Sequence, residues 1–580
     1  MCGIFGHTNF TEENLDASRQ ALHTLKHRGP DQWNDWWHEG VYMGHRRLSI
    51  MDLSENGKQP MIDKDHGVAI TVNGEIYNFK EIKKILNNKY NFRSNSDSEV
   101  VLYAYIEWGI DGLLNRIDGI FAISIYDFVK NKIYLVRDHV GVKPLYYSLI
   151  NKALAWASEL KSIMELYAER LPETDYTALY DYLTYLYIPA PKTPYKNIFK
   201  LEPATYIEFD LAQKSLLKKR YWTLNVNTVK INPKDASKRL IDLLRNQIKA
   251  QMMSDVPVGF FLSGGIDSSS VVALGAEVSN KIHTYSIGFE NSTEDETPFA
   301  QLLAKRYKTH HHEEKLSIET SQALLKNMKE WFDEPFADTS ALPTFLVSKF
   351  ARKSATVVLT GDGGDELFGG YRWYALFEEY SRGFGIKLPF LKYLFSSSSL
   401  QRGNSLLSKA TRQINYRFIL SPFEIYAKLL GGMIHAEKRK YRKMWNIDPK
   451  YDSYWYFKQF YKAELPLKKR LQYLDFHTYL PDDILTKVDR VSMAVALECR
   501  VPLLGKDLVE FVFSLPEEIR LPHGIPKGLL KESMKGFLPE KILNKRKKGF
   551  SIPLKDWRKK IIGSYQNKQL FLLHEVFKSL

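Results

Sequence analysis

The second residue of the chain is a cysteine, and its position permits an unusual kind of nucleophilic chemistry. Removal of Met1 would leave Cys2 with a thiol and the free α-amino group on one residue. That amine has an ordinary pKa of about 8, so it is partly neutral at pH 7 and can act as the base for its own thiol. A small residue at a frayed end would look the same, but residues 3–6 predict a strand that holds the terminus. The sequence therefore suggests a terminal thiol nucleophile.

A nucleophile needs donors for an oxyanion and groups that hold its substrate. Asn73 and Gly74 follow a predicted strand and offer a side-chain amide beside an unhindered N–H, although Asn-Gly is also a common hairpin turn. Arg47 lies in an alternating segment and could hold a carboxylate through two hydrogen bonds, or simply form a surface ion pair. Glu75 and Asp97 could receive an ammonium group.

A glycine- and serine-rich segment in the second half has the composition of a phosphate-binding loop. Residues 263–269 (SGGIDSS) stand between a predicted strand at 256–262 and a predicted helix at 268–278. Backbone N–H groups at the two glycines, the serine hydroxyls and the helix start all favour an anion. Asp267 would repel a phosphate unless a divalent cation lies between them, so the loop implies Mg²⁺. A serine-capped turn without a ligand is the alternative.

A second polar loop follows the next buried strand of this half. Residues 360–366 (TGDGGDE) contain three carboxylates, including Asp362 and Asp365. If the sheet is parallel, this loop and the glycine-serine loop lie at the same edge and face one crevice. The carboxylates could hold a metal or a substrate cation, with Asp267 and Asp365 as the metal ligands, or form a solvated turn. Lys487 and Arg490 could neutralise phosphate charge, or be ordinary surface charges of a helix.

The elements that would position these residues differ between the two halves. Up to about residue 210, short alternating strands interleave with helices at 14–25 and 97–108, which predicts sheets covered by helices. Polar sequence at 210–232 suggests the domain boundary. Beyond it, apolar strands at 256–262, 282–289 and 355–359 alternate with helices, as in a doubly covered parallel sheet. After Gly370 the chain is predicted to be mostly helical.

Composition narrows the class of protein. The 580 residues carry a net charge of +15, and residues 531–560 hold eleven Lys or Arg against three acids. This local basic segment suits a phosphate-bearing small molecule, so we expect no nucleic-acid partner, although a polynucleotide is the alternative. Two cysteines exclude a disulfide framework. Neither a membrane-spanning stretch nor a secretion signal is evident, and we expect a cytoplasmic, soluble chain without a membrane partner.

Taken together, these segments resemble the glutamine-dependent asparagine synthetases. Eleven matching segments occur in the family's order, from Cys2 to about Trp557. They are Met1–Gly6, Arg28–Asp31, His45–Asp52, Asn73–Asn78, Ser96–Glu99, Arg137–Tyr147, Ser263–Ser269, Ser286–Phe289, Thr360–Tyr371, Leu485–Pro502 and Gly549–Pro553. Asp362 departs from the pattern, because some members have a glutamate there.

For the first half, the resemblance implies a class II glutamine amidotransferase domain at residues 2–215. Such a domain is an αββα sandwich of the N-terminal-nucleophile type. Cys2 would attack the glutamine amide, and Asn73 with Gly74 would form the oxyanion hole. The residues implied to bind glutamine are Arg47, Leu48, Ser49, Ile50, Met51, Asn73, Gly74, Glu75 and Asp97.

For the second half, the resemblance implies an ATP-pyrophosphatase domain at residues 235–580, with the adenine-nucleotide α-hydrolase fold. Asp362 would act in forming an aspartyl-adenylate, and Lys487 with Arg490 would contact phosphate. The residues implied to bind ATP are Leu262, Ser263, Gly264, Gly265, Asp267, Ser268, Ile287, Thr360 and Gly361. The substrates implied are glutamine, aspartate and ATP with Mg²⁺, and a homodimer is plausible. Relatives that amidate other carboxylates, such as sugar acids, keep the acceptor open.

Overall fold

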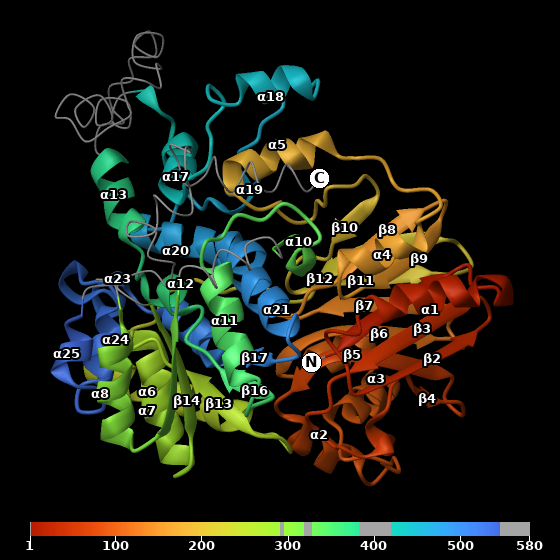
Figure 1. Ribbon diagram of the computed structural model, residues 1–580, viewed down its shortest axis with the longest axis horizontal. Helices are drawn as coiled ribbons and strands as arrows, with labels where there is room; N and C mark the ends of the chain where they lie inside the picture. The colour runs from red at the N-terminus through yellow and green to blue at the C-terminus, as the bar shows by residue number, and fades with distance from the viewer. Residues whose placement is uncertain (1, 290–294, 318–327, 382–418, 546–580) are drawn as a thin grey trace.

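The computed structural model describes residues 2–289, 295–317, 328–381 and 419–545. Within these ranges three sheets form the framework, and helices cover them (Figure 1). Two sheets within the first 220 residues are antiparallel, and the third, within residues 258–500, is parallel. Among the described helices, none combines the length and the apolar character that crossing a bilayer requires. The fold class expected from the sequence, α+β followed by α/β, is confirmed.

The two antiparallel sheets pack face to face and form the inner layers of an αββα sandwich. Ile4 of the first sheet and Ala122 of the second lie in one buried cluster between them. Helices α1 (Leu15–His23) and α4 (Leu160–Leu166) cover the first sheet, and α2 (Phe79–Leu86) and α3 (Asp97–Leu114) cover the second. The first sheet has the order β10 (Ile198–Lys200), β8 (Tyr146–Ile150), β9 (Ala153–Ala157), β1 (Gly3–Thr8), β3 (Val41–Arg47), β2 (Gln32–His38). The second has the order β12 (Ser215–Arg220), β11 (Thr205–Asp210), β7 (Lys132–Arg137), β6 (Gly119–Asp127), β5 (Val68–Ile76), β4 (Met61–Asp63).

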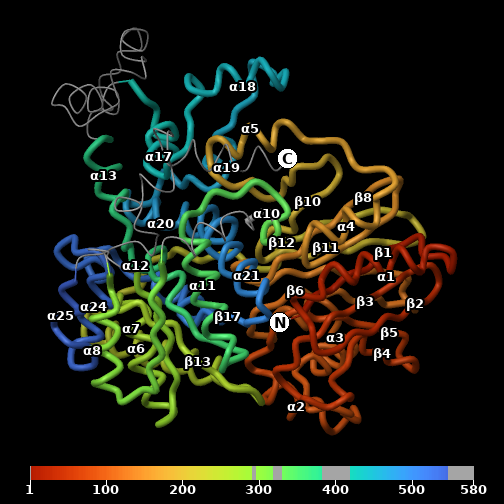
Figure 2. Tube along the Cα trace, in the orientation of Figure 1, coloured from red at the N-terminus to blue at the C-terminus, as the bar shows by residue number. Residues whose placement is uncertain are grey.

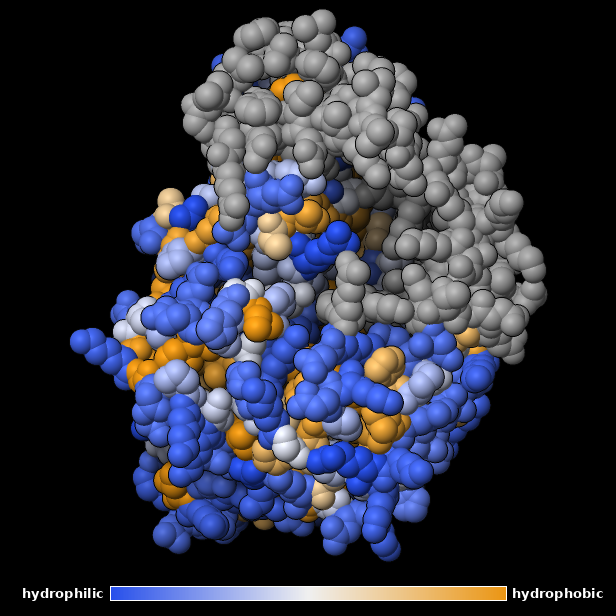
Figure 3. Space-filling model, turned by 90° about the vertical axis from the view of Figure 1, so that its left-hand side faces the viewer, coloured by the Kyte–Doolittle hydropathy of each residue, from blue (hydrophilic) through white to orange (hydrophobic). Residues whose placement is uncertain are grey.

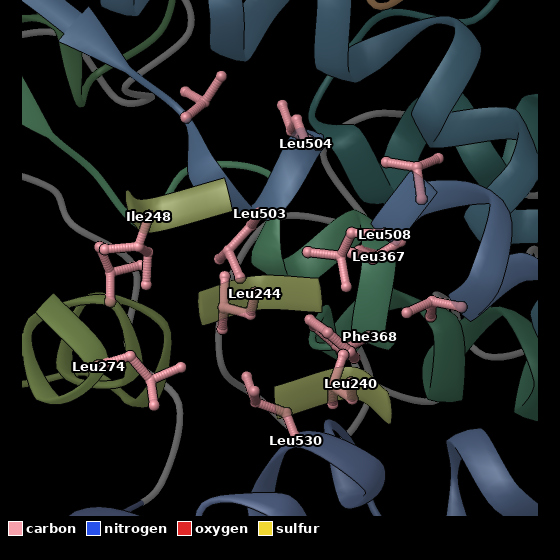
Figure 4. Packing of buried hydrophobic residues seen from close by; sticks show 14 of the residues in the cluster. Leu240, Leu244, Ile248, Leu274, Leu367, Phe368, Leu503, Leu504, Leu508 and Leu530 are labelled. Carbon is pink, nitrogen blue, oxygen red and sulfur yellow. The ribbon is translucent and has the colours of Figure 1, made fainter. Parts of the chain in front are cut away.

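The parallel sheet is covered on both faces, as its near-continuous apolar strands predict. Its order is β15 (His310–Leu316), β14 (His283–Phe289), β13 (Val258–Phe261), β16 (Val357–Leu359), β17 (Glu498–Arg500). Helices α6 (Pro233–Gln251), α7 (Ile266–Val278) and α8 (Thr297–Tyr307) pack on one face, where Leu240, Leu244 and Leu274 join Leu503 and Leu504 in a single core (Figure 4). Helices α11 (Ala341–Ala351) and α21 (Thr486–Met493) pack on the other face.

Helices dominate the described chain beyond the acidic loop, in agreement with the sequence prediction. Figure 2 shows them stacked above and beside the parallel sheet, and the side of the molecule in Figure 3 is mainly hydrophilic with small separate apolar groups. These helices are α12 (Gly364–Phe368), α13 (Arg372–Ser381), α17 (Pro422–Leu430), α18 (Arg439–Met444), α19 (Trp455–Phe460), α20 (Leu467–His477), α22 (Lys506–Ser514), α23 (Glu517–Arg520), α24 (Gly528–Ser533) and α25 (Glu540–Leu543). Two further helices are α5 (Tyr176–Tyr185) and α10 (Met328–Trp331).

Two local expectations from the sequence are wrong. Residues 215–220 lie in the polar segment assigned to the boundary, yet they form the edge strand β12, whose exposed Lys218 and Lys219 mask any apolar alternation. The Asn73-Gly74 pair does not follow a strand or form a turn. It lies inside β5, opposite Ala122 and Phe121 of β6.

The sandwich and the parallel sheet meet over a buried interface. Leu48 and Ile50, just after β3, pack in one cluster with Val357 and Met493 of the second half. The backbones are joined as well, because the Asp255 N–H donates to the Ile50 carbonyl over 3.0 Å. This interface brings the cysteine end of the sandwich toward β17 and α21 (Figure 1).

Candidate active sites

Cys2 lies at the start of β1, in the middle of the first sheet, and is buried. Its backbone N–H donates to Asn73 Oδ1 over 3.0 Å, which ties the first sheet to the second at this point. Its Sγ lies 4.0 Å from the carbonyl oxygen of Leu48. Burial raises the pKa of the Cys2 thiol. A base close to the sulfur is therefore needed to form the thiolate at neutral pH.

Asn73 and Gly74 lie beside Cys2, and the close packing of β5 on β6 explains the glycine. A Cβ at Gly74 would come within 2.0 Å of the Ile120 carbonyl oxygen, and its φ of +153° disfavours other residues. Asn73 Nδ2 donates to Ser158 Oγ over 3.4 Å, so its side-chain amide is held between two partners. A rigid amide beside the thiol is the arrangement that an oxyanion hole requires.

Two buried carboxylates lie at the end of β5 and the start of α3. Glu75 is 3.3 Å from the Arg500 guanidinium, and Asp97 accepts the Ile76 N–H over 2.7 Å. Burial raises the pKa of Asp97 to about 6, and it raises the pKa of Glu75 well above its ordinary range although Arg500 opposes that change. An arriving ammonium group would lower both pKa values and stabilise the charged carboxylates.

The Arg47 guanidinium, which was expected to hold a substrate carboxylate, is hydrogen-bonded to other parts of the protein. Its two terminal nitrogens donate to Gln32 Oε1 over 2.8 Å, and to the backbone carbonyl oxygens of Met51, Asp52 and Ser54. The guanidinium therefore shapes the loop of residues 48–54 around itself. In this loop the Leu48 and Ile50 side chains face the second half, whereas the Ser49 N–H donates to Asp31 over 2.8 Å.

The glycine-serine loop forms the turn between β13 and α7, as predicted. Ser263 Oγ and Ser268 Oγ lie 3.1 Å apart, and the Gly265 N–H donates to Ser263 Oγ over 3.3 Å. Gly264 has a φ of +69°, and a Cβ there would come within 2.6 Å of Phe299. The serine hydroxyls thus gather at the start of a mostly buried, thirteen-residue helix, whose first N–H groups favour an anion.

A cavity of about 900 Å³ opens over this loop at the carboxyl ends of the parallel strands. Its size and position suit a nucleotide. Among the residues predicted to bind ATP, the lining contains Leu262, Ser263, Gly265, Asp267, Ser268, Ile287, Thr360 and Gly361, together with Asp362, Asp365 and Lys487. Gly264 and Arg490 are not in this lining.

The two polar loops are in direct contact. A Cβ at Gly361 would come within 2.6 Å of the Ser268 backbone nitrogen, and one at Gly364 within 2.5 Å of Asp267 Cγ. The tight approach of Gly364 to Asp267 favours a glycine at this position. The structure therefore brings together the two loops that the sequence placed at one edge of the sheet.

Lys487 and Arg490 lie on the same buried helix, α21, but face different surroundings. Burial alone would lower the pKa of Lys487, yet the carboxylates of Asp362 and Asp338 raise it, so Lys487 stays charged in the cavity. Arg490 instead lies 3.1 Å from Glu159 Oε2 and 2.9 Å from Asp333 Oδ1. The structure does not bring Arg490 to a phosphate site, because its guanidinium joins the two halves of the chain.

Two known protein families match this chain, one in each half. The asparagine synthase family model matches residues 239–575, and the glutamine amidotransferase domain model matches residues 1–222. The chain belongs to the asparagine synthase family. The resemblance inferred from the sequence is confirmed.

Individual members of the asparagine synthase family align with this chain over most of its length. Glutamine-hydrolysing asparagine synthetase 1 of Bacillus subtilis is 34% identical over 572 residues, which cover 96% of this chain and 88% of that protein. Putative glutamine-hydrolysing asparagine synthetase 2 of Methanocaldococcus jannaschii is 36% identical over 538 residues, 85% of this chain and 98% of that protein. A putative asparagine synthetase of Mycobacterium bovis is 30% identical over 576 residues, 94% and 86% of the two chains.

Two cations of the asparagine synthase cavity escaped the sequence analysis. Lys527 Nζ lies 2.6 Å from Asp365 Oδ1 and also pairs with Asp267, so it bridges the two polar loops. Lys545 Nζ donates to the Gly264 carbonyl over 3.1 Å and pairs with Glu296. The basic segment at 531–560 hinted at such a role, but residues from 546 on lie outside the described ranges.

The acidic residues of the cavity fit a divalent cation that is shared with phosphate. Asp267 Oδ1 is buried and has no hydrogen-bond partner within the described residues. Among those residues no group of three His, Cys, Asp or Glu side chains gathers as a complete metal site. Mg²⁺ characteristically binds through one or two carboxylates together with substrate phosphates and water. Asp267 and Asp365 satisfy that pattern.

Proposed function

We propose that this chain makes asparagine from aspartate, taking the nitrogen from glutamine and using ATP. The observation that carries the proposal is the presence, in one chain, of a terminal thiol beside a rigid amide and of a nucleotide-sized cavity lined by both polar loops. Residues 2–215 form the glutaminase domain and residues 235–580 the synthetase domain. Both belong to a cytoplasmic enzyme, and a homodimer is the assembly we expect.

In the glutaminase site, Cys2 Sγ attacks the amide carbon of glutamine, with its own α-amine as base. Asn73 and the Gly74 N–H donate to the developing oxyanion. When this tetrahedral intermediate collapses, the α-ammonium returns its proton to the leaving nitrogen, ammonia departs and a γ-glutamyl thioester of Cys2 remains. Water then hydrolyses the thioester to glutamate and the free thiol. Glu75 and Asp97 bind the α-ammonium group of glutamine, which adds a positive charge to that of Arg500 beside these buried carboxylates. The loop that Arg47 shapes, residues Leu48, Ser49, Ile50 and Met51, binds the carboxylate end.

In the synthetase site, the glycine-serine loop binds the phosphates of ATP, and the adenine lies near Leu262 and Ile287. When bound, Mg²⁺ neutralises phosphate charge, with Asp267 and Asp365 as its protein ligands. The aspartate side chain attacks the α-phosphorus, which releases pyrophosphate and forms an aspartyl-adenylate. Lys487 stabilises the added negative charge, and Asp362 faces the intermediate. Ammonia then displaces AMP and forms the amide.

The acceptor is tested by supplying one carboxylic acid at a time. The enzyme is incubated with ATP, Mg²⁺, glutamine and either aspartate or a sugar acid, and pyrophosphate and the amide product are measured. We expect pyrophosphate and asparagine only with aspartate. Pyrophosphate with a uronic acid and none with aspartate would show that the same chemistry serves another acceptor.

A further inference from the structure

A short turn of the first half carries a lysine into the interface between the two halves. Residues 138–145 follow β7, and Val140 and Val142 pack in the core of the parallel-sheet half. His139 Nε2 lies 2.9 Å from the Leu504 carbonyl oxygen. The backbone of Lys143 is fixed from both sides, because its N–H donates to Asp138 and its carbonyl accepts from Arg137, each over 2.9 Å.

The ammonium group of Lys143 is buried, and no described residue accepts a hydrogen bond from it. Its residue has no exposed surface, and Nζ makes no hydrogen bond within the described residues. Other buried lysines do have acceptors: Lys200 donates to the Ile188 carbonyl, and Lys438 donates to Ser453 and the Tyr180 carbonyl. A buried donor without an acceptor is costly, so its persistence calls for a ligand or water that it binds.

Burial and the charges around Lys143 have opposite effects on its pKa. Carboxylates of Glu498, Asp489 and Asp138 favour its charged form, whereas burial and Arg28 oppose it, so the pKa of Lys143 is lowered. None of these carboxylates makes a hydrogen bond to Nζ. Burial outweighs them, and the N–H groups of Nζ stay available to a ligand.

Lys143 also lies between the two sites. On one side, Arg28 Nε donates to the Cys2 carbonyl over 3.1 Å, and the Arg28 guanidinium acts on Lys143. On the other side, the turn that carries Lys143 meets Leu504 through His139, and a Cβ on Gly363, the neighbour of Asp362, would come within 2.4 Å of the Leu504 side chain. Lys143 therefore lies in the buried region that separates Cys2 from Asp362.

We propose that Lys143 Nζ is a binding site for ammonia on its way from the thiol to the adenylate. This inference rests on the proposed function. Neutral ammonia has one lone pair and accepts a hydrogen bond from the lysine ammonium. Ammonium has no lone pair and therefore cannot accept this hydrogen bond. The site thus selects the nucleophilic form of the nitrogen and keeps it inside the protein.

The test measures how many asparagine molecules form for each glutamate released. Lys143→Met keeps the length of the side chain but removes its donors and charge. We expect the ratio of asparagine to glutamate to fall about fivefold, with the missing nitrogen recovered as free ammonia in solution. An unchanged ratio in the folded variant overturns the proposal.

Two comparisons separate this result from a structural effect or from failure of the proposed function. Lys438→Met removes another buried lysine, far from either site in its contacts, and should leave the ratio at the wild-type value. Lys143→Met should also melt no lower than the wild type, because an apolar side chain replaces an unpartnered buried charge. If the wild type makes no asparagine from either nitrogen source, the proposed function itself is wrong.

Discussion

The two cysteines show that burial by itself does not identify a nucleophile. Both thiols are buried, and burial raises the pKa of Cys499 to about 12 and also raises that of Cys2. What distinguishes Cys2 is the hydrogen bond from its backbone N–H to Asn73. In the function proposed above, its α-amine, freed by removal of Met1, serves as its base. Cys499 lies inside β17, whose backbone groups are used by the sheet.

The carboxylates opposite Cys2 predict how glutamine binding depends on pH. The pKa of Asp97 is raised to about 6, so its protonated fraction grows as the pH falls through that value. Protonation removes the charge that pairs with the substrate ammonium. In the Cys2→Ala protein, which cannot hydrolyse glutamine, we expect the Kd of glutamine to rise below about pH 6, approaching tenfold per pH unit.

Calorimetric titration between about pH 5 and pH 8 measures that Kd. Asp97→Asn in the same background should bind more weakly and lose most of the dependence on pH. A wild-type-like dependence in Asp97→Asn would assign the titration to a different group, such as Glu75.

At the scale of elements, the sequence predicted the arrangement of the sites better than their local conformations. The order of strands and helices around β13, α7 and β16 followed from apolar runs and glycines, so the contact between the two polar loops was foreseeable. The conformation of Asn73-Gly74 was not, because its strand geometry depends on the distant Ile120 carbonyl. Lys527 and Arg490 could not be assigned either, since their partners lie up to several hundred residues away in the sequence.

The contact between the polar loops predicts a selective defect in Gly361→Ala. The new Cβ would lie 2.6 Å from a backbone nitrogen, so one loop must move, at a cost of about 1–3 kcal/mol. We expect the KM for ATP in ammonium-dependent synthesis to rise about tenfold. Glutaminase activity of the same variant should stay near the wild-type value. A wild-type KM for ATP in Gly361→Ala would show that the contact between the two polar loops does not matter for ATP binding.

The buried ion pair between Arg28 and Asp489 of helix α21 predicts an effect on stability. The Arg28 guanidinium is fully buried and bonds Asp489 through two nitrogens, over 2.8 and 3.1 Å. Arg28→Met leaves Asp489 charged and buried, which should destabilise the protein by about 3–5 kcal/mol. The double variant Arg28→Met/Asp489→Leu should recover much of that loss, because Glu159 keeps its contact with Arg490. Thermal melting of the single variants and the double variant measures the effect, and equal melting of all of them would refute it.

For the whole molecule, the distribution of charge supports the division of labour between the halves. The net charge is +15, yet the basic residues described near the cavity mostly face carboxylates: Lys527 lies between Asp267 and Asp365, and Lys545 pairs with Glu296. A phosphate group that enters the cavity must therefore compete with these carboxylates for the lysines. In the first half, in contrast, burial raises the pKa values of the two carboxylates Glu75 and Asp97.

The buried interface between the halves makes a prediction about the origin of the amide nitrogen. If ammonia moves inside the protein, nitrogen from glutamine reaches the adenylate before it mixes with solvent. With unlabelled glutamine and an equal concentration of ¹⁵N-ammonium in the medium, we expect the asparagine amide to carry mainly ¹⁴N, as mass spectrometry of the product will show. The Cys2→Ala protein should incorporate ¹⁵N throughout, because its synthetase site can use only ammonia from the medium. Label entering the wild-type product in proportion to the free ammonia in solution would mean that the nitrogen leaves the protein between the sites.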